Sequence, residues 1–351
     1  MRPAAKTSVA MEPGILARFD TILDARTLEE YVEDHVPGAV CTPVLDEAER
    51  ARVGTIYKQQ SAFDARRIGA ALVARNVAHH IETLFAAQPK NWKPLVYCWR
   101  GGKRSGALAH ILREVGWGAV TLEGGYKAYR RYAVQRLAEL PGALKFRVLH
   151  GATGSGKSRL LRELRACGAQ VLDLEELAAH RGSVLGGLPA QPQPAQKMFE
   201  SLVLHELEAM SAAKPVFVEA ESRKIGQLQV PEGLIGAMRE AECVAIDAAL
   251  ATRVELLMGE YRHFFEDRPT LDAQLDCLVA LHGKERIEDW KALARSARWS
   301  DLVGRLLEEH YDPAYRRSAS KNFSGLARAE VLRLPGADDA AFSRIAKELA
   351  A

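Results

Sequence analysis

The sequence predicts an α/β protein made of two parallel-sheet units, the second of which ends in a helical region. Three observations lead to this prediction. Short apolar runs alternate with amphipathic stretches through the first 140 residues, the turn signal Pro141-Gly142 precedes a second strand-loop-helix pattern, and the chain beyond Ala248 is mostly helical in pattern. We therefore predict two domains, residues 1–140 and residues 141–351.

In the first domain, short apolar segments predict strands, and apolar residues at helical spacing between 108 and 115 predict a helix that begins close to Ser105. Cys98 is thereby placed on a turn from a strand to a helix. In the second domain, a strand is expected just before a glycine-rich loop. The expected strands are residues 19–24, 94–98, 119–122 and 146–149.

Composition limits the class of protein. With 48% hydrophobic residues the chain can form packed cores, and no apolar run approaches the roughly 20 residues of a membrane helix. The N-terminal segment lacks the apolar stretch of a signal peptide, so we expect a cytoplasmic protein without membrane association. The five cysteines include no Cys-x-x-Cys pair, so a functional cysteine should act singly as a thiol. The net charge of +3 permits a polyanionic partner but does not establish one.

The segment from Cys98 to Ser105 has the residues of an anion-binding loop that carries a nucleophile. Amide groups of a glycine-rich turn converge on one point, and the following helix adds about half a positive charge. A thiol in this position should ionise readily, and the same loop should hold a phosphate-like oxyanion. The candidate catalytic residues are Cys98, Arg100 and Arg104, and the candidate oxyanion-binding residues are Trp99, Gly101, Gly102, Lys103 and Ser105.

Motifs on both sides of this loop resemble those of rhodanese domains. Residues 22–26, 30–31 and 35–40 resemble the opening motif of that family, and residues 122–126 resemble its closing motif. Five residues separate Cys98 from Arg104, where sulfurtransferases of the family usually have four. The larger loop resembles that of rhodanese-like phosphatases, which accept a tetrahedral phosphate, so a phosphatase remains an alternative.

Residues 151–158 fit the phosphate-binding pattern G-x-x-x-x-G-K-[ST] at every fixed position, between a predicted strand and a predicted helix. The loop amides should wrap a di- or triphosphate, Lys157 should reach its outer oxygens, and the Ser158 hydroxyl is placed to bind Mg²⁺. The expected phosphate-binding residues are Gly151, Thr153, Gly154, Ser155, Gly156, Lys157 and Ser158. An acidic partner for the metal is also expected at a strand end. The candidates, among which the sequence does not choose, are Asp173, Glu219, Glu221 and Asp247.

A rhodanese-like domain followed by a phosphate-loop domain resembles the tRNA 2-selenouridine synthases along essentially the whole chain. This chain has Ile56 where members of that family often have Cys, and Ala220 where they commonly have Asp. The segment 186–196, rich in Gly, Pro and Gln, is expected to be a loop that can move over a site. The segments that carry the resemblance are residues 46–60, 180–183, 192–194, 219–226 and 311–315.

The resemblance implies a two-step reaction on tRNA that carries 2-thiouridine at the wobble position. Geranyl diphosphate first alkylates the sulfur, and selenophosphate, provided by a selenophosphate-supplying enzyme, then replaces the alkylated sulfur with selenium. The phosphate loop would hold the diphosphate with Mg²⁺, and Cys98 with its loop would receive selenophosphate and hand on selenium. The candidate contacts to tRNA or substrate are His180, Arg181, Ser183, Glu219, Glu221, Arg223, Lys224, Tyr311, Tyr315, Arg316 and Arg317.

Two alternatives stay open from the sequence. One is a tRNA sulfurtransferase that uses ATP to activate the nucleotide while Cys98 carries a persulfide. The other is a regulatory module in which the phosphate loop senses a nucleotide and the rhodanese-like part is a docking surface.

Overall fold

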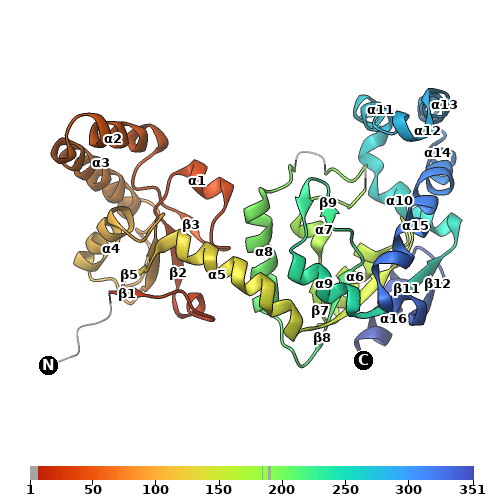
Figure 1. The fold of residues 1–351 in the computed structure, drawn as a ribbon, viewed down its shortest axis with the longest axis horizontal. Helices are drawn as coiled ribbons and strands as arrows, with labels where there is room; N and C mark the ends of the chain where they lie inside the picture. Colours follow the sequence, from red (N-terminus) through yellow and green to blue (C-terminus); the bar gives the residue numbers. More distant parts are fainter. Residues whose placement is uncertain (1–6, 184, 189–190) are drawn as a thin grey trace. The chain divides into compact units, whose positions relative to one another are not determined.

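The computed structural model describes residues 7–183, 185–188 and 191–351, and the chain divides into two compact units (Figure 1). The first comprises Met1–Arg136 with Glu200–Leu202, and the second comprises Leu137–Phe199 with Val203–Ala351. Each unit is built around a parallel sheet of its own, which confirms the predicted α/β class. No helix in the described part of the chain is long and apolar enough to cross a membrane.

The sheet of the first unit has five parallel strands in the order β1-β5-β4-β2-β3. The central strand β4 is buried along its whole length, and Cys98, the residue that follows it, is also buried in this core. The two edge strands are only two residues long, too short to leave a pattern in the sequence. The strands are β1 (Ser8–Val9), β2 (Thr21–Asp24), β3 (Val40–Cys41), β4 (Pro94–Tyr97) and β5 (Val120–Leu122).

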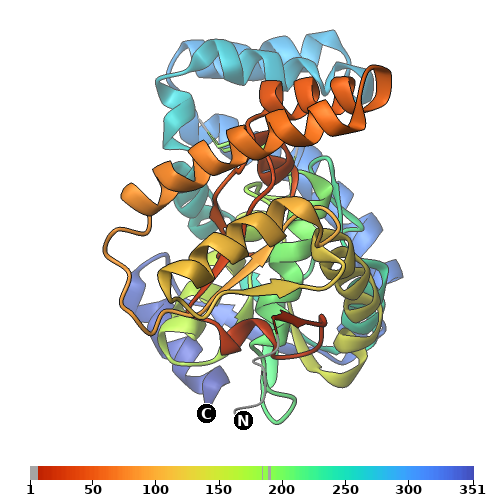
Figure 2. The same ribbon diagram turned by 90° about the vertical axis from the view of Figure 1, so that its left-hand side faces the viewer.

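Helices surround this sheet, and α2 and α3 pack along each other as a pair (Figures 1 and 2). Helix α4 begins at Lys103, directly after the glycine pair, and ends at Gly116 in the left-handed conformation. Its buried face, including Leu108 and Leu112, packs on the core formed by the central strands. The helices are η1 (Leu16–Arg18), α1 (Leu28–Glu33), α2 (Glu47–Gln59), α3 (Ala62–Glu82), α4 (Lys103–Val115) and α5 (Gly125–Glu139).

The sheet of the second unit has five parallel strands in the order β12-β11-β6-β8-β7. Leu149 of β6 is in register with Glu219 of β8, so the loop after β6 and the end of β8 meet at one edge. The C-terminal region is mostly helical, as predicted, and contains one strand: β12 is half exposed and pairs with β11. The strands are β6 (Lys145–His150), β7 (Gln170–Leu172), β8 (Pro215–Glu219), β11 (Glu242–Ala248) and β12 (Glu330–Leu334), with an antiparallel pair β9 (Lys224–Ile225) and β10 (Leu228–Gln229).

Two apolar cores hold the helices of the second unit. Helix α16 packs on α6 through Phe342 and Leu161, and a separate core around Trp290 and Leu302 joins the helices that follow α10. The helices over and beside the sheet are η2 (Leu140–Ala143), α6 (Lys157–Ala166), α7 (Leu174–Leu177), α8 (Gln196–Glu208), α9 (Glu232–Glu240) and α16 (Asp339–Ala350). Those of the helical region are α10 (Leu250–Glu260), η3 (Arg262–Phe265), α11 (Arg268–Asp276), α12 (Val279–His282), α13 (Lys284–Arg295), α14 (Trp299–Leu306), the π-helical turn η4 (Leu307–Tyr311), α15 (Asp312–Asn322) and η5 (Ser324–Arg328).

Candidate functional site

The thiol of Cys98 lies at the end of the central strand of the first unit, inside the turn that leads into α4. Its Sγ accepts hydrogen bonds from the amide of Gly102 at 3.3 Å and from the hydroxyl of Ser105 at 3.2 Å. Burial alone would raise the pKa of this thiol, but hydrogen bonds from the Ser105 hydroxyl and from nearby backbone amides outweigh it and lower the pKa. The loop therefore favours the nucleophilic thiolate.

The closing motif predicted from sequence forms one wall of this loop. The amide of Tyr126 donates to the carbonyl of Cys98 at 2.8 Å, and the next amide, from Lys127, donates to the carbonyl of Trp99 at 3.2 Å. Gly101 has a φ of +64°, and a Cβ there would lie 2.5 Å from the carbonyl oxygen of Leu122. The glycine is needed because two backbone segments approach closely at this point.

The charged residues of the loop differ in their surroundings. Arg104 donates two hydrogen bonds to Glu30, at 2.6 and 3.2 Å, and both side chains are largely buried. Arg100 and Lys103 are exposed at the surface of the loop. Arg104 is thus engaged by the opening motif, a contact that the sequence did not indicate.

Trp99 is also engaged within the first unit. Its ring stacks on that of Tyr126 with centroids 5.3 Å apart, and the Lys127 ammonium lies 5.9 Å from its ring centroid. This stack holds the indole against the wall of the Cys98 loop.

In the second unit, the phosphate-binding loop joins β6 to α6, as the motif requires. Gly154 and Gly156 have φ values of +78° and +81°, and a Cβ on either would lie within 3 Å of a packed side chain, Leu257 or Phe342. The Lys157 ammonium donates to the carbonyl of Gly151 at 3.0 Å. The loop is therefore fixed by packing from α10 and α16, with Lys157 folded back over it.

A buried ion pair supports the loop from the helical region. The Arg253 guanidinium donates to the carbonyl of Thr153 at 2.9 Å and makes two hydrogen bonds to Asp312, at 3.0 and 2.6 Å. Asp312 belongs to the segment 311–315 that was singled out in the sequence, whereas Arg253 was missed. Nothing local marks Arg253, because it lies 100 residues from Thr153 in the chain.

A cluster of carboxyl groups lies beside Lys157 and Ser158. The Ser158 hydroxyl donates to Glu175 at 2.6 Å, and the amide of Glu175 donates to Glu219 at 2.8 Å. Burial, reinforced by neighbouring carboxylates, raises the pKa of Glu219 well above its ordinary value and that of Glu221 to about 8. Nearby Lys157 opposes the rise in pKa for Glu221 and Glu175. A cation bound here would therefore compete with the protons of Glu219 and Glu221.

The oxygens in this cluster fit a magnesium ion that is bound together with a phosphate. Such an ion takes one or two protein oxygens and fills its remaining positions with phosphate oxygens and water. Ser158 and Glu175 supply adjacent oxygens, and the second carboxylate oxygen of Glu219 is buried without a hydrogen-bond partner among the described residues. Within the described ranges no three His, Cys, Asp or Glu side chains form a metal site by themselves.

The four acidic candidates from the sequence thus separate. Glu219 and Glu221 belong to the cluster. The Asp173 carboxylate caps helix α7, where it accepts from the amide of Glu176, and it lies close enough to the cluster to help raise the pKa of Glu219. Asp247 is exposed on β11. Glu175, which contacts Ser158, was missed, although it stands only two residues after Asp173.

Comparisons with known proteins agree with both halves of this description. Residues 12–132 match the model of the rhodanese-like domain, and residues 144–276 match the model of the tRNA 2-selenouridine synthase AAA domain. A tRNA 2-selenouridine synthase of Salmonella dublin is 32% identical over 347 residues, which cover 89% of this chain and 92% of that protein. The chain belongs to the tRNA 2-selenouridine synthase family. The resemblance inferred from the sequence is confirmed.

Other members of the family are longer than the matched region. Synthases of Nitrosomonas europaea and Bdellovibrio bacteriovorus are each 36% identical, over 244 and 253 residues. Each match covers 68% of this chain but only 63% and 64% of those proteins. The matches thus span less than two thirds of the length of these relatives.

Three of the synthase segments singled out in the sequence gather in the second unit. The amide nitrogen of the Gln193 side chain donates to the carbonyls of Ala178 and Ile225, at 3.2 and 3.0 Å, and its oxygen accepts from the amide of Gln227 at 2.8 Å. Gln193 therefore ties the predicted loop 186–196 to the segments on either side of it. Pro189 and Ala190 of that loop lie outside the described residues.

Apart from Glu219 and Glu221 of the carboxyl cluster, the residues expected to contact tRNA or substrate fall into two groups. Arg181 donates to the carbonyl of Glu260 at 2.7 Å and its guanidinium lies over the ring of Tyr261, while Tyr315 shares a hydrogen bond with the backbone of Gly151. These residues, with half-buried His180, Ser183 and Tyr311, are built into the unit. The basic residues exposed to a polyanion are Arg223, which pairs with Glu232, and Lys224, Arg316 and Arg317.

Proposed function

We propose that this chain forms 2-selenouridine in tRNA, as the name of its relatives suggests, and that it does so by replacing sulfur with selenium at 2-thiouridine in the wobble position. One observation carries the proposal: the chain combines an activated thiol in an oxyanion loop with a second loop built for a diphosphate. In this proposal the Cys98 loop binds selenophosphate, and the phosphate-binding loop binds the diphosphate of the geranyl donor. The activity belongs in the cytoplasm, where tRNA is modified.

The first step alkylates the sulfur of the thiouridine with geranyl diphosphate. A lone pair on sulfur forms the S–C1 bond, the C1–O bond breaks with its electrons going to diphosphate, and the N3 proton of the base is released. Loop amides and Lys157 stabilise the charge on the departing diphosphate. Ser158 and Glu175 would hold Mg²⁺, which supplies further neutralisation of that charge. Alkylation matters because an S-alkyl group leaves as a thiolate, whereas a thione sulfur is a poor leaving group.

The second step uses selenophosphate, from a selenophosphate-supplying enzyme, at the Cys98 loop. The thiolate attacks phosphorus, the P–Se bond breaks, and selenium leaves with the electron pair as hydroselenide, HSe⁻, after taking one proton. Hydroselenide adds to C2 of the alkylated base, its proton passes to N3, and geranyl thiolate leaves with the C–S electrons. Water then returns the phosphorylated cysteine to the thiol with release of phosphate. No oxidant or reductant is needed.

Nucleoside mass spectrometry of thiolated tRNA tests this scheme. The purified protein is incubated with geranyl diphosphate and selenophosphate, each donor being omitted in turn. Lys157→Ala should leave 2-thiouridine unchanged, and Cys98→Ala should accumulate the geranylated nucleoside. Cys167→Ala, at an exposed cysteine, is the matched control and should give 2-selenouridine.

The alternatives predict different results. A sulfurtransferase would hydrolyse ATP in the presence of tRNA and would form no geranylated nucleoside. A regulatory module would leave selenouridine in cellular tRNA unchanged after Cys98→Ala. Either result would replace the proposed function.

A further inference from the structure

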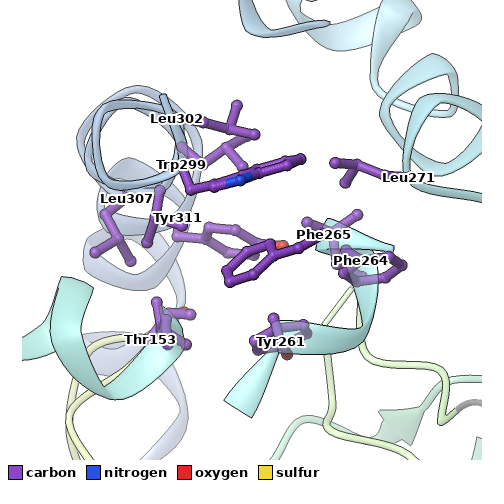
Figure 3. Close-up of a pocket in the computed structure, with 13 residues that line it drawn as sticks. Thr153, Tyr261, Phe264, Phe265, Leu271, Trp299, Leu302, Leu307 and Tyr311 are labelled. Atoms are coloured by element: carbon purple, nitrogen blue, oxygen red, sulfur yellow. The ribbon is translucent and has the colours of Figure 1, made fainter. Parts of the chain in front are cut away.

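An apolar pocket lies in the helical region of the second unit, and one of its walls is the phosphate-binding loop itself (Figure 3). Thr153 of that loop lines the pocket together with aromatic and aliphatic side chains from η3, α11, α14 and the turn η4. The surface that faces the pocket is almost entirely carbon. A pocket of this kind has no role in binding phosphate or a metal ion.

We propose that this pocket holds the hydrocarbon chain of the diphosphate ester whose head group binds at the phosphate loop, and that Phe265 and Trp299 set the chain length it accepts. The inference rests on the proposed function, since it concerns the same donor. Beyond the proposed function, the inference says where the hydrocarbon chain binds and which residues select among hydrocarbon chains of different length.

The pocket and the phosphate loop share residues, which makes them two parts of one site. Thr153 belongs to both, and its carbonyl is fixed by Arg253 at 2.9 Å. Leu257 lines the pocket and also packs on Gly154, where a Cβ would lie 2.8 Å from it. The pocket is therefore next to the loop that would hold the charged head group of such a ligand.

The chemistry of the pocket lining determines which kind of group, attached to the diphosphate, the pocket can hold. A nucleoside base and ribose carry several donors and acceptors, and burying them without partners is costly. The pocket offers carbon surface instead, from residues such as Leu271, Leu302 and Leu306. Burial of each methylene group of a hydrocarbon in such surroundings is favourable. The lining thus favours an isoprenoid chain over a nucleoside.

The end of the pocket away from the phosphate loop is formed by aromatic rings. Figure 3 shows Thr153 and Tyr261 at one end, with Trp299 and Leu302 at the opposite end. Phe265 stacks on Trp299 with ring centroids 4.7 Å apart and 25° between the planes. In Figure 3 the Phe265 ring lies between the Thr153 end and Trp299, so a chain that enters at Thr153 meets Phe265 first and then Trp299, and the two rings limit how long the chain can be.

Binding measured without tRNA tests the inference, because no transfer can then occur. The probes are inorganic diphosphate, geranyl diphosphate and the longer farnesyl diphosphate. The parent protein should bind geranyl diphosphate at least about tenfold more tightly than inorganic diphosphate. Phe265→Ala should improve farnesyl binding relative to geranyl binding by about tenfold. Val303→Phe, which fills the pocket from a half-buried position, should weaken geranyl binding about tenfold and leave inorganic diphosphate binding unchanged.

Leu281→Ala is the matched control, since Leu281 is 72% exposed in the same helical region and does not line the pocket. It should change none of the three affinities. Phe265→Ala and Val303→Phe could instead keep the relative affinities of the parent protein for the three probes, while Lys157→Ala abolishes binding of all three. In that case the pocket assignment is wrong and the proposed function stands. The pocket assignment would also be wrong if Val303→Phe weakened binding of inorganic diphosphate as much as binding of geranyl diphosphate. If the ratios change as expected but no geranylated nucleoside forms with tRNA, the pocket assignment holds and the proposed function fails.

Discussion

Gly125 lies so close to the Cys98 loop that a Cβ on it would stand 2.1 Å from the carbonyl oxygen of Cys98 and 2.4 Å from the amide nitrogen of Gly101. Its φ of +56° is also a conformation that other residues rarely adopt. Helix α5 begins at this residue, so the start of the helix and the reactive loop share one backbone contact.

Gly125→Ala should therefore lower the free energy of unfolding by about 3 kcal/mol, because both the backbone conformation and the contact become unfavourable. Chemical denaturation measures the change. Gly54→Ala in α2 is the control: nothing lies within 4 Å of its added Cβ, so the variant should be neutral or stabilised by up to about 1 kcal/mol. Equal stability of the two variants would show that the contact at Gly125 is unimportant.

The Ser105 hydroxyl should account for much of the reactivity of Cys98. Its hydrogen bond stabilises the thiolate, so Ser105→Ala should raise the pKa of Cys98, and alkylation of Cys98 should then require a higher pH. The pH dependence of alkylation, followed by peptide mass spectrometry, gives the midpoint. Ser8→Ala, which removes the hydroxyl of a half-buried serine bonded to Glu123, should not move this midpoint. An unchanged midpoint in Ser105→Ala would contradict the assignment.

The ion pair between Arg253 and Asp312 should control binding at the phosphate loop. Asp312→Asn leaves a largely buried guanidinium without its charge partner, so we expect a loss of about 3 kcal/mol in stability and about a tenfold loss in diphosphate affinity. Calorimetry measures both. Asp301→Asn breaks the exposed pair with Arg298 and should cost no more than about 1 kcal/mol, with diphosphate affinity retained. Similar losses in the two variants would argue against a specific role for Asp312.

Glu175 should determine how strongly diphosphate binding depends on magnesium. Glu175→Gln removes a charge next to the Ser158 hydroxyl, so the gain in diphosphate affinity on adding Mg²⁺ should fall about tenfold. Glu176→Gln is the control, because this neighbour is exposed and pairs with Arg165. If the two variants respond equally to Mg²⁺, Glu175 does not take part in binding the ion.

The carboxyl cluster should make stability fall as the pH rises. The pKa of Glu221 is raised from 4.5 to about 8 in the folded chain, so the folded state holds a proton that the unfolded state has released. The stabilisation of the folded state by this bound proton is fully present below about pH 4.5 and is lost as the pH rises through 8. Glu221→Gln cannot ionise, so its melting temperature relative to the parent should increase between pH 5 and about 8. A difference that stays constant with pH would mean that Glu221 ionises normally.

Local sequence patterns were sufficient to predict the α/β class, the central strands and the two loops. Strand ends followed by glycines and a helical pattern are local features, because backbone conformation depends on neighbouring residues. For this reason the residues around Cys98 and Lys157 were enough to assign both side chains to strand-to-helix turns. The short strands β1 and β3 and the half-exposed β12 were missed because each carries too little apolar pattern.

The side chains that complete each loop, in contrast, are brought there by tertiary packing. Glu30 reaches Arg104 across 74 residues, and Asp312 reaches Arg253 across 59. Glu219 comes to the phosphate loop because β8 pairs with β6, an order of strands that no local pattern specifies. The apolar pocket beside Thr153 likewise needs helices that are distant in sequence to pack together. Such contacts depend on the path of the whole chain, whereas the loops themselves depend only on a few adjacent residues.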